Sequence, residues 1–128
     1  MDLRTLHPPS YPQKCRKRGY GDPMNQDIYD RLKKISERLK KEYHAEKVIL
    51  YGSYARGEES EDSDIDLFII APTNEKFFDR LATVLRMIRD LKKGFPIEPI
   101  VLTTEEVEKR VTIGDQFIKE ILERGSYL

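Results

Sequence analysis

The sequence has very little cysteine, no long apolar run and no excess of either charge. Cys15 is the only cysteine among 128 residues, which excludes an internal disulfide framework or a cysteine-based zinc cluster and suits a reducing compartment. Lys and Arg together number 23, as do Asp and Glu. The chain therefore lacks the global positive field that attracts nucleic acid, and we do not expect it to bind nucleic acid.

Apolar segments are also short. The longest purely apolar run covers residues 67–71, far fewer than the roughly 20 residues needed to cross a bilayer. Residues 1–13 contain no apolar segment of the kind found in secretory signals. We therefore expect a cytoplasmic protein that is not associated with a membrane.

Length and composition predict one domain that follows a short arm. Residues 1–24 contain four prolines and the basic run KCRKR, without helical or strand periodicity, so we expect a flexible arm there. The basic run is either a solvated segment or a contact for a phosphate backbone. Residues 25–128 carry the regular apolar patterns, and their length is typical of a single domain of about 100 residues.

Apolar residues at spacings of three and four predict amphipathic helices. The first such stripe covers residues 28–43, after Asn25, a residue type that favours a helix N-terminus. A longer helix is expected to begin at Thr73 or Asn74 and to end at Gly94. Its predicted buried stripe consists of Phe77, Leu81, Val84, Leu85, Ile88 and Leu91.

Two shorter helices are predicted in the last third of the sequence. Thr103 and Glu106 have the spacing of a capping box, which predicts a helix from there to Arg110. A final helix is expected to end at Gly125. Its predicted apolar stripe consists of Ile113, Phe117, Ile121 and Leu122.

Three apolar segments predict the strands of a small mixed sheet, so the expected fold class is α/β (α+β). Residues 47–51 (KVILY) form a short, almost entirely apolar run, and residues 64–70 alternate between apolar and mixed positions. Residues 95–102 contain Pro96 and Pro99, which predict an edge strand because each lacks a backbone donor. We expect three to four strands, with the first two antiparallel and the third parallel to the second after a right-handed crossover.

The loop between the first two strands combines an anion site with carboxylates. Gly52 and Ser53 end the first strand and lead into the helical segment SYARG, which leaves backbone N–H groups for an anion. Asp64 and Asp66 share one face at the start of the second strand, and Glu98 is expected beside them. Three neighbouring carboxylates repel one another, which costs stability unless cations compensate their charge. Hard oxygen ligands favour Mg²⁺, and two such ions would leave room for a polyphosphate.

This arrangement resembles the signature of the DNA polymerase β-like nucleotidyltransferase superfamily. Gly52-Ser53, a spacer of ten residues and the triplet DID at 64–66 all match that pattern. The segment GSYARGEESEDSDIDLFII most resembles the minimal nucleotidyltransferase (MNT) branch of that superfamily, of the antitoxin type. The resemblance covers residues 28–128 and implies a polymerase β-like nucleotidyltransferase fold.

The resemblance also implies roles for the site residues. Gly52 and Ser53 would cradle the β and γ phosphates of ATP or another nucleoside triphosphate. Asp64 and Asp66 would hold two Mg²⁺ ions. Glu98 would complete the metal site and help to deprotonate an acceptor hydroxyl, which then attacks the α phosphate and releases pyrophosphate.

Three residues of this region have open interpretations. Arg56 either neutralises phosphate charge or forms an ordinary surface ion pair. Ser63 either orients the aspartate loop or caps a turn. Glu98 stands where the resembled family more often has Asp, and Pro99 follows it, which leaves its competence as a third metal ligand open.

The expected function is Mg²⁺-dependent transfer of a nucleoside monophosphate, AMP from ATP, to a hydroxyl. Larger relatives append an acceptor-binding domain that this sequence does not accommodate, so the acceptor is expected on a partner or a second subunit of a homo-oligomer. The resemblance implies a tyrosine of a HEPN-type helical partner, with this chain as the antitoxin of a toxin-antitoxin pair. The alternative is a non-catalytic nucleotide-binding module that acts by contact. A third interpretation is nucleotide addition to RNA or to a small molecule such as an antibiotic.

Overall fold

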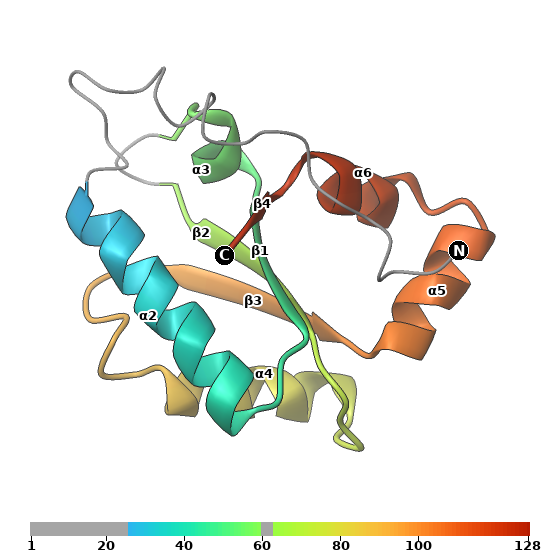
Figure 1. The fold of residues 1–128 in the computed structure, drawn as a ribbon, viewed down its shortest axis with the longest axis horizontal. Helices are drawn as coiled ribbons and strands as arrows, with labels where there is room; N and C mark the ends of the chain where they lie inside the picture. The colour runs from blue at the N-terminus through green and yellow to red at the C-terminus, as the bar shows by residue number, and fades with distance from the viewer. Residues whose placement is uncertain (1–25, 60–62) are drawn as a thin grey trace.

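A four-stranded mixed sheet with the strand order β3-β2-β1-β4 forms the centre of the protein (Figure 1). Our computed structural model describes residues 26–59 and 63–128, so the arm expected over 1–24 lies outside the described residues. The strands are β1 (Lys47–Tyr51), β2 (Ile65–Ile70), β3 (Ile97–Leu102) and β4 (Ser126–Tyr127). The helices are α2 (Gln26–Glu42), α3 (Ser53–Arg56), α4 (Phe77–Met87), α5 (Thr104–Thr112) and α6 (Gln116–Arg124). None of the described helices combines the length and apolar character needed to cross a membrane.

Strand pairing confirms the predicted α/β class and its topology. β1 and β2 are antiparallel, with Tyr51 opposite Asp66. β2 and β3 are parallel, with Asp66 opposite Glu98. β3 lies at one edge of the sheet. Pro99 is tolerated there because an edge strand has no partner strand on its outer side that would need the missing backbone N–H group. β4 pairs with the other side of β1, with Ser126 opposite Leu50.

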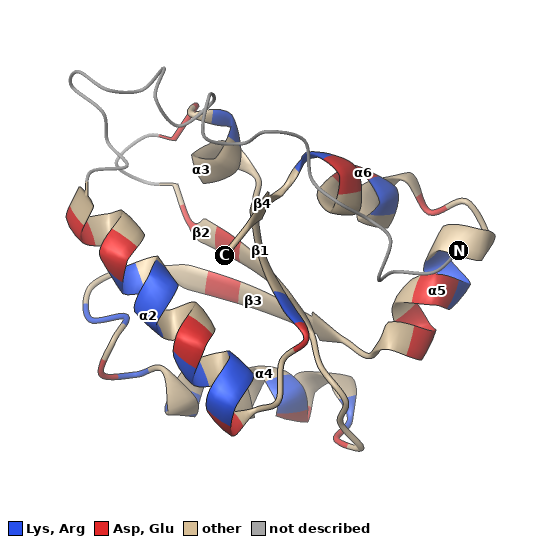
Figure 2. Ribbon diagram, viewed as in Figure 1, with Lys and Arg blue, Asp and Glu red and all other residues tan. Residues whose placement is uncertain are grey.

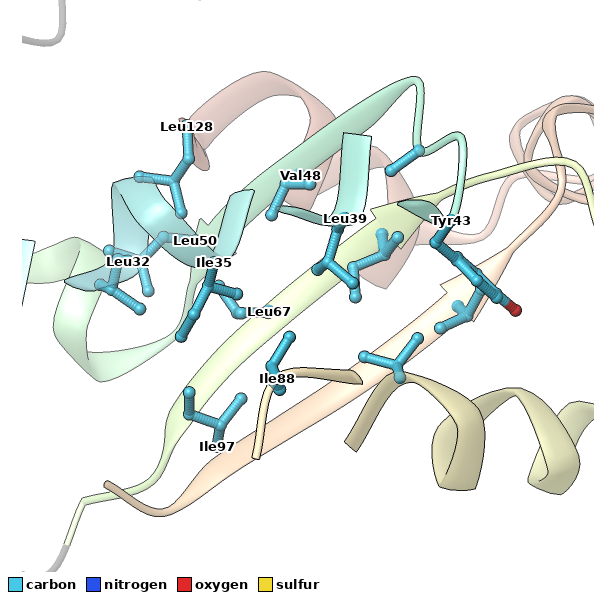
Figure 3. Packing of buried hydrophobic residues seen from close by; sticks show 14 of the residues in the cluster. Leu32, Ile35, Leu39, Tyr43, Val48, Leu50, Leu67, Ile88, Ile97 and Leu128 are labelled. Atoms are coloured by element: carbon cyan, nitrogen blue, oxygen red, sulfur yellow. The ribbon is translucent and has the colours of Figure 1, made fainter. Parts of the chain in front are cut away.

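One face of the sheet is covered by α2 and α4 (Figures 1 and 3). Leu32, Ile35 and Leu39 of α2 are fully buried against this face, because their spacing puts them on one side of the helix. β2 contributes its odd-numbered residues here, and Leu67 is fully buried among them. The larger of the two apolar clusters therefore lies on this side.

The opposite face carries a smaller apolar cluster under α5 and α6. β2 contributes Phe68 and Ile70 to it, both at most 1% exposed. Val107 of α5 and Ile121 of α6 pack against them. Because side chains alternate along a strand, Asp66 points to this same face.

The predicted start and end of the long helix are wrong. Its N-cap is Lys76, and it ends at Met87, well before Gly94. The Oγ1 atom of Thr73 accepts a hydrogen bond of 3.0 Å from the backbone N–H of Glu75, so this residue closes a local turn and does not cap the helix. Phe77, predicted as core, is 40% exposed.

The predicted stripe of the final helix is also partly wrong. Ile113 and Phe117 are 69% and 51% exposed. A turn at Gly114, with φ of 84°, separates α5 from α6, and the Asp115 carboxylate caps α6 by accepting from the N–H of Ile118 at 3.2 Å. The helical phase is therefore reset at this break. The core residues of α6 are Ile118, Ile121 and Leu122.

A buried arginine connects the two sides of the sheet. The Arg80 side chain of α4, 8% exposed, forms an ion pair with Glu106 of α5, with Nη1 and Oε1 2.7 Å apart. Its Nη1 also donates to the Val101 carbonyl oxygen at 3.1 Å. Glu106 takes part in the predicted capping box with Thr103, which the structure confirms.

Candidate functional site

The predicted acidic residues meet at the start of the parallel strand pair. Asp66 and Glu98 occupy directly opposed positions of β2 and β3, and Asp64 precedes β2. Figure 2 shows a red, acidic position on β2 and another on the neighbouring β3. Asp64 and Glu98 are exposed, and Asp66 is half-buried. The structure therefore brings the predicted carboxylates to one accessible place.

The surroundings of Asp66 and Glu98 raise the pKa values of both carboxyl groups. Burial raises the pKa of Asp66, and the negative charge of Asp64 raises it further, while Arg56 opposes the shift. A side-chain hydrogen bond with Asp64 raises the pKa of Glu98, and the charges of Asp64 and Asp66 act in the same direction. Negative charge nearby thus disfavours the ionised forms of Asp66 and Glu98, as like charges do at close range.

Tyr51 lies beside this acidic group, opposite Asp66 in the sheet. Burial raises the pKa of its hydroxyl to about 12, and the charges of Asp66 and Glu98 contribute. Its ring meets the ring of Phe117 edge to face, with centroids 5.7 Å apart and an interplanar angle of 83°. This aromatic pair links the acidic group to α6.

The Gly52-Ser53 turn packs directly against Asp66. Gly52 has φ of 79°, a conformation that favours glycine. A Cβ atom at this position would collide with the Oδ2 atom of Asp66. Glycine is therefore required twice here, by its backbone conformation and by the closeness of the carboxylate. α3 begins immediately after it, so backbone N–H groups of the first helical turn lack carbonyl partners within the helix.

Arg56 and Ser63 are two of the three residues whose interpretation the sequence left open. Arg56 is exposed, and its Nε atom forms an ion pair with the Oε1 atom of Glu58 at 2.8 Å. That hydrogen bond is the main cause that raises the pKa of Arg56. Ser63 is half-buried next to Asp64. The ion pair of Arg56 agrees with the surface interpretation, although its side chain also faces the pocket described below.

The three carboxylates suit a metal ion that binds together with a phosphate-containing ligand. Within residues 26–59 and 63–128, no group of three or more His, Cys, Asp or Glu side chains is arranged to hold a metal ion. Mg²⁺ does not need such a cage, because it commonly binds through one or two carboxylates, water and substrate phosphate. Asp64, Asp66 and Glu98 supply hard oxygen donors and an excess of negative charge, so their chemistry fits Mg²⁺.

A pocket of about 410 Å³ opens between α3 and α6 beside Asp66. Its lining consists of Tyr51, Gly52, Ala55, Arg56, Asp66, Phe117, Glu120, Ile121, Arg124 and Gly125. The sequence analysis did not single out Tyr51, Glu120 or Arg124, and it assigned Phe117 to the core. A signal was available, because positions 117, 120, 121 and 124 share one face of a helix and carry aromatic and charged side chains as well as an aliphatic one.

The sequence matches a family of known domains over most of its length. The profile of the nucleotidyltransferase domain matches residues 32–128. This range contains the Gly-Ser turn, the three carboxylates and the whole of α6.

Two similar proteins come from Methanocaldococcus jannaschii. "Putative protein adenylyltransferase MJ0604" is 35% identical over 99 residues, which are 76% of this chain and 93% of that protein. "Putative protein adenylyltransferase MJ1379" is 31% identical over 81 residues, 63% of this chain and 79% of that protein. A crystal structure titled as a putative nucleotidyltransferase from Sulfolobus solfataricus has 27% sequence identity and a TM-score of 0.46, and the match covers 71% of this chain and 85% of that one.

Proposed function

The chain belongs to the family of nucleotidyltransferase domains, and on this premise we propose that it transfers AMP from ATP to a hydroxyl group of another protein. Membership of the family makes it an enzyme of the transferase class. The observation that carries the finer proposal is the placement of Asp66 directly beside Glu98, with Gly52 packed on the Asp66 carboxylate.

Three parts of the site lie in order across the sheet. Glu98 is on β3, Asp66 is on the neighbouring β2, and Gly52 follows β1 on the far side of β2. In-line displacement at phosphorus needs an attacking oxygen, the phosphorus atom and a leaving oxygen in one line. The order of the strands supports an acceptor near Glu98, an α phosphate near Asp66 and a leaving pyrophosphate near Gly52.

Asp64, Asp66 and Glu98 would hold the divalent metal, for which we propose two Mg²⁺ ions. When bound, these ions would neutralise the charge that develops on the α phosphate and on the leaving pyrophosphate. Gly52 and Ser53 would donate backbone and hydroxyl hydrogen bonds to the β and γ phosphates.

The transfer itself exchanges one bond at the α phosphorus for another. The acceptor oxygen bonds to the α phosphorus, and the bond from that phosphorus to the bridging oxygen of the β phosphate breaks. The electron pair of the broken bond leaves with pyrophosphate. Glu98 would accept the hydroxyl proton, and its exposed position on an edge strand is open to a protein-borne acceptor.

We propose a tyrosine of a HEPN-type helical protein as the acceptor, with this chain as the antitoxin of the pair. Two observations support a protein acceptor. The relatives described above are named as protein adenylyltransferases, and the motif over residues 52–70 resembles the MNT branch. Modification of the partner would then inactivate it.

The test is incubation of the protein with Mg²⁺ and α-labelled ATP, with and without a HEPN-type partner from a neighbouring gene, followed by mass spectrometry of both chains. We expect AMP on the partner, and no label with the double variant Asp64→Asn, Asp66→Asn. The matched control is Asp79→Asn, an exposed carboxylate on α4, which should leave transfer unchanged.

Two results would contradict the proposal. Transfer that persists in the double variant would show that Asp64 and Asp66 are not needed for the reaction. If the double variant forms the complex and neutralises the partner as well as the wild type does, the protein acts by contact, and the non-catalytic alternative applies.

A further inference from the structure

The pocket between α3 and α6 extends the site beyond its sequence motif. Gly52 and Arg56 line the side that belongs to the motif, and Arg124 lines the side that belongs to α6. About 70 residues of sequence separate the two sides. A cation is therefore placed next to the Gly-Ser turn from a part of the chain that the motif does not include.

Close packing fixes the end of α6 in this position. A Cβ atom at Gly125 would lie 2.6 Å from the Ile121 carbonyl oxygen and would collide with the Ile49 side chain of β1. The next residue, Ser126, pairs with Leu50 in the sheet. Arg124 thus directly precedes a segment that is held against β1. The paired residue of β1, Leu50, lies two residues before Gly52.

The charges around the pocket leave Arg124 available for a ligand. Arg56 is paired with Glu58, whereas in the part of the chain that the structure describes no carboxylate lies within ion-pair distance of Arg124. Glu120 also lines the pocket, four residues before Arg124 on the same helical face. A guanidinium in this setting offers several donors, and its planar geometry matches phosphate oxygens.

Given the proposed transfer reaction, on which this inference rests, we propose that Arg124 binds the β and γ phosphates of the triphosphate from the side opposite Gly52 and Arg56. As the bond between the α phosphorus and the bridging oxygen breaks, negative charge accumulates on the leaving pyrophosphate. The guanidinium of Arg124 then faces the group on which that charge develops. Arg124 is a phosphate-binding residue, and it does not take part in proton transfer.

The test compares ligands that differ only in their phosphate tail. Affinities of Arg124→Ala and Arg124→Lys for a non-transferable Mg·ATP analogue, for AMP and for inorganic tripolyphosphate are measured by calorimetry. We expect Arg124→Ala to weaken binding of the ATP analogue and of tripolyphosphate by about 10- to 100-fold, the usual effect of losing a charge-assisted hydrogen-bonding group. AMP affinity should stay unchanged, and Arg124→Lys should retain part of the lost affinity.

Lys119→Ala is the matched control, because Lys119 is an exposed cation of α6 that is absent from the pocket lining. It should bind every ligand as the wild type does. The inference is overturned if Arg124→Ala binds the ATP analogue with wild-type affinity while its unfolding transition is intact. It is also overturned if Phe117→Ala loses adenosine binding while Arg124→Ala keeps tripolyphosphate binding, since the pocket would then hold the base. If the wild type binds neither ATP nor tripolyphosphate, the proposed function fails instead.

Discussion

On one face of the sheet, Ile65, Leu67 and Ile69 are at most 1% exposed beneath α2 and α4. On the other face, Asp66 is only half-buried and Glu98 is exposed, because α5 and α6 leave the beginning of β2 and β3 uncovered. The same six-residue strand therefore contributes one set of alternate residues to a closed apolar layer. Its other face begins with Asp66 in an open acidic site and continues with the buried Phe68 and Ile70. The closed face provides the rigidity on which the geometry of the open face depends.

Leu67→Ala should give the largest change in stability. Leu67 is fully buried on the closed face, so its truncation should cost about 2–5 kcal/mol in the free energy of unfolding, measured by urea denaturation. The adjacent Asp66 lies on the other face, so AMP transfer by the folded protein should persist. Phe78→Ala, at a side chain that is 78% exposed, is the control and should change stability by less than about 0.5 kcal/mol. A Leu67→Ala protein of normal stability but without activity would contradict the assignment of stability to one face of the sheet and of activity to the other.

Gly52→Ala should affect the open face selectively. The added Cβ would displace the Asp66 carboxylate, and a shift of about 1 Å at a reacting centre can cost roughly 10²-fold in rate. Gly94→Ala is the matched control, because Gly94 has a similar φ of 74° and nothing within 4 Å of the added Cβ. Gly94→Ala should lose about 1–2 kcal/mol of stability from its positive φ. Gly52→Ala should lose more, because its φ of 79° and ψ of −153° lie in a region that is essentially restricted to glycine, and only this variant should lose transfer activity. Equal loss of activity in both would show that the Gly52 contact is irrelevant.

Glu106→Gln should weaken the connection between the two faces. It removes the charge that pairs with Arg80 but keeps a side chain that suits the capping box with Thr103. We expect a loss of about 1–2 kcal/mol, below the value for a fully buried pair because the Glu106 side chain is 43% exposed and water screens it. Glu105→Gln, in the same first turn of α5, should have a smaller effect.

The Glu106 effect should depend on pH. The hydrogen bond from Arg80 is the main cause that lowers the pKa of Glu106 below its ordinary value of 4.5. The folded state therefore binds fewer protons than the unfolded state, so this stabilisation is present above pH 4.5 and is lost as the pH falls through the folded pKa. The difference between wild type and Glu106→Gln should shrink on acidification. A constant difference would contradict the ion-pair explanation.

Local sequence patterns predicted most of the fold. The strands over 47–51 and 64–70, the edge position of the proline-containing strand and the capping box at Thr103 are confirmed. The start of α4 was missed because contacts from distant residues hold the segment before it. Glu75 accepts hydrogen bonds from Tyr43 at 3.1 Å and from Thr83 at 2.6 Å. Neither of these contacts is visible in the pattern around residue 73.

The site was predicted where its residues lie close to the Gly-Ser turn or on adjacent strands. The grouping of Asp66 with Glu98 followed from the parallel crossover, which the structure confirms. Arg124 and Phe117 were missed because their position depends on the break at Gly114 and on the short β4 pairing that returns α6 to β1. The roles of the site residues in metal and nucleotide binding stay predictions.

Hydrogen-deuterium exchange with and without a non-transferable Mg·ATP analogue tests most directly whether nucleotide binds the open face. We predict slower exchange in α3, at the start of β2 and in the second half of α6, with no change in the part of α2 that packs on the closed face. Tight binding of the analogue without protection of α3 and the start of β2, or with protection confined to α2 and α4, would contradict this account.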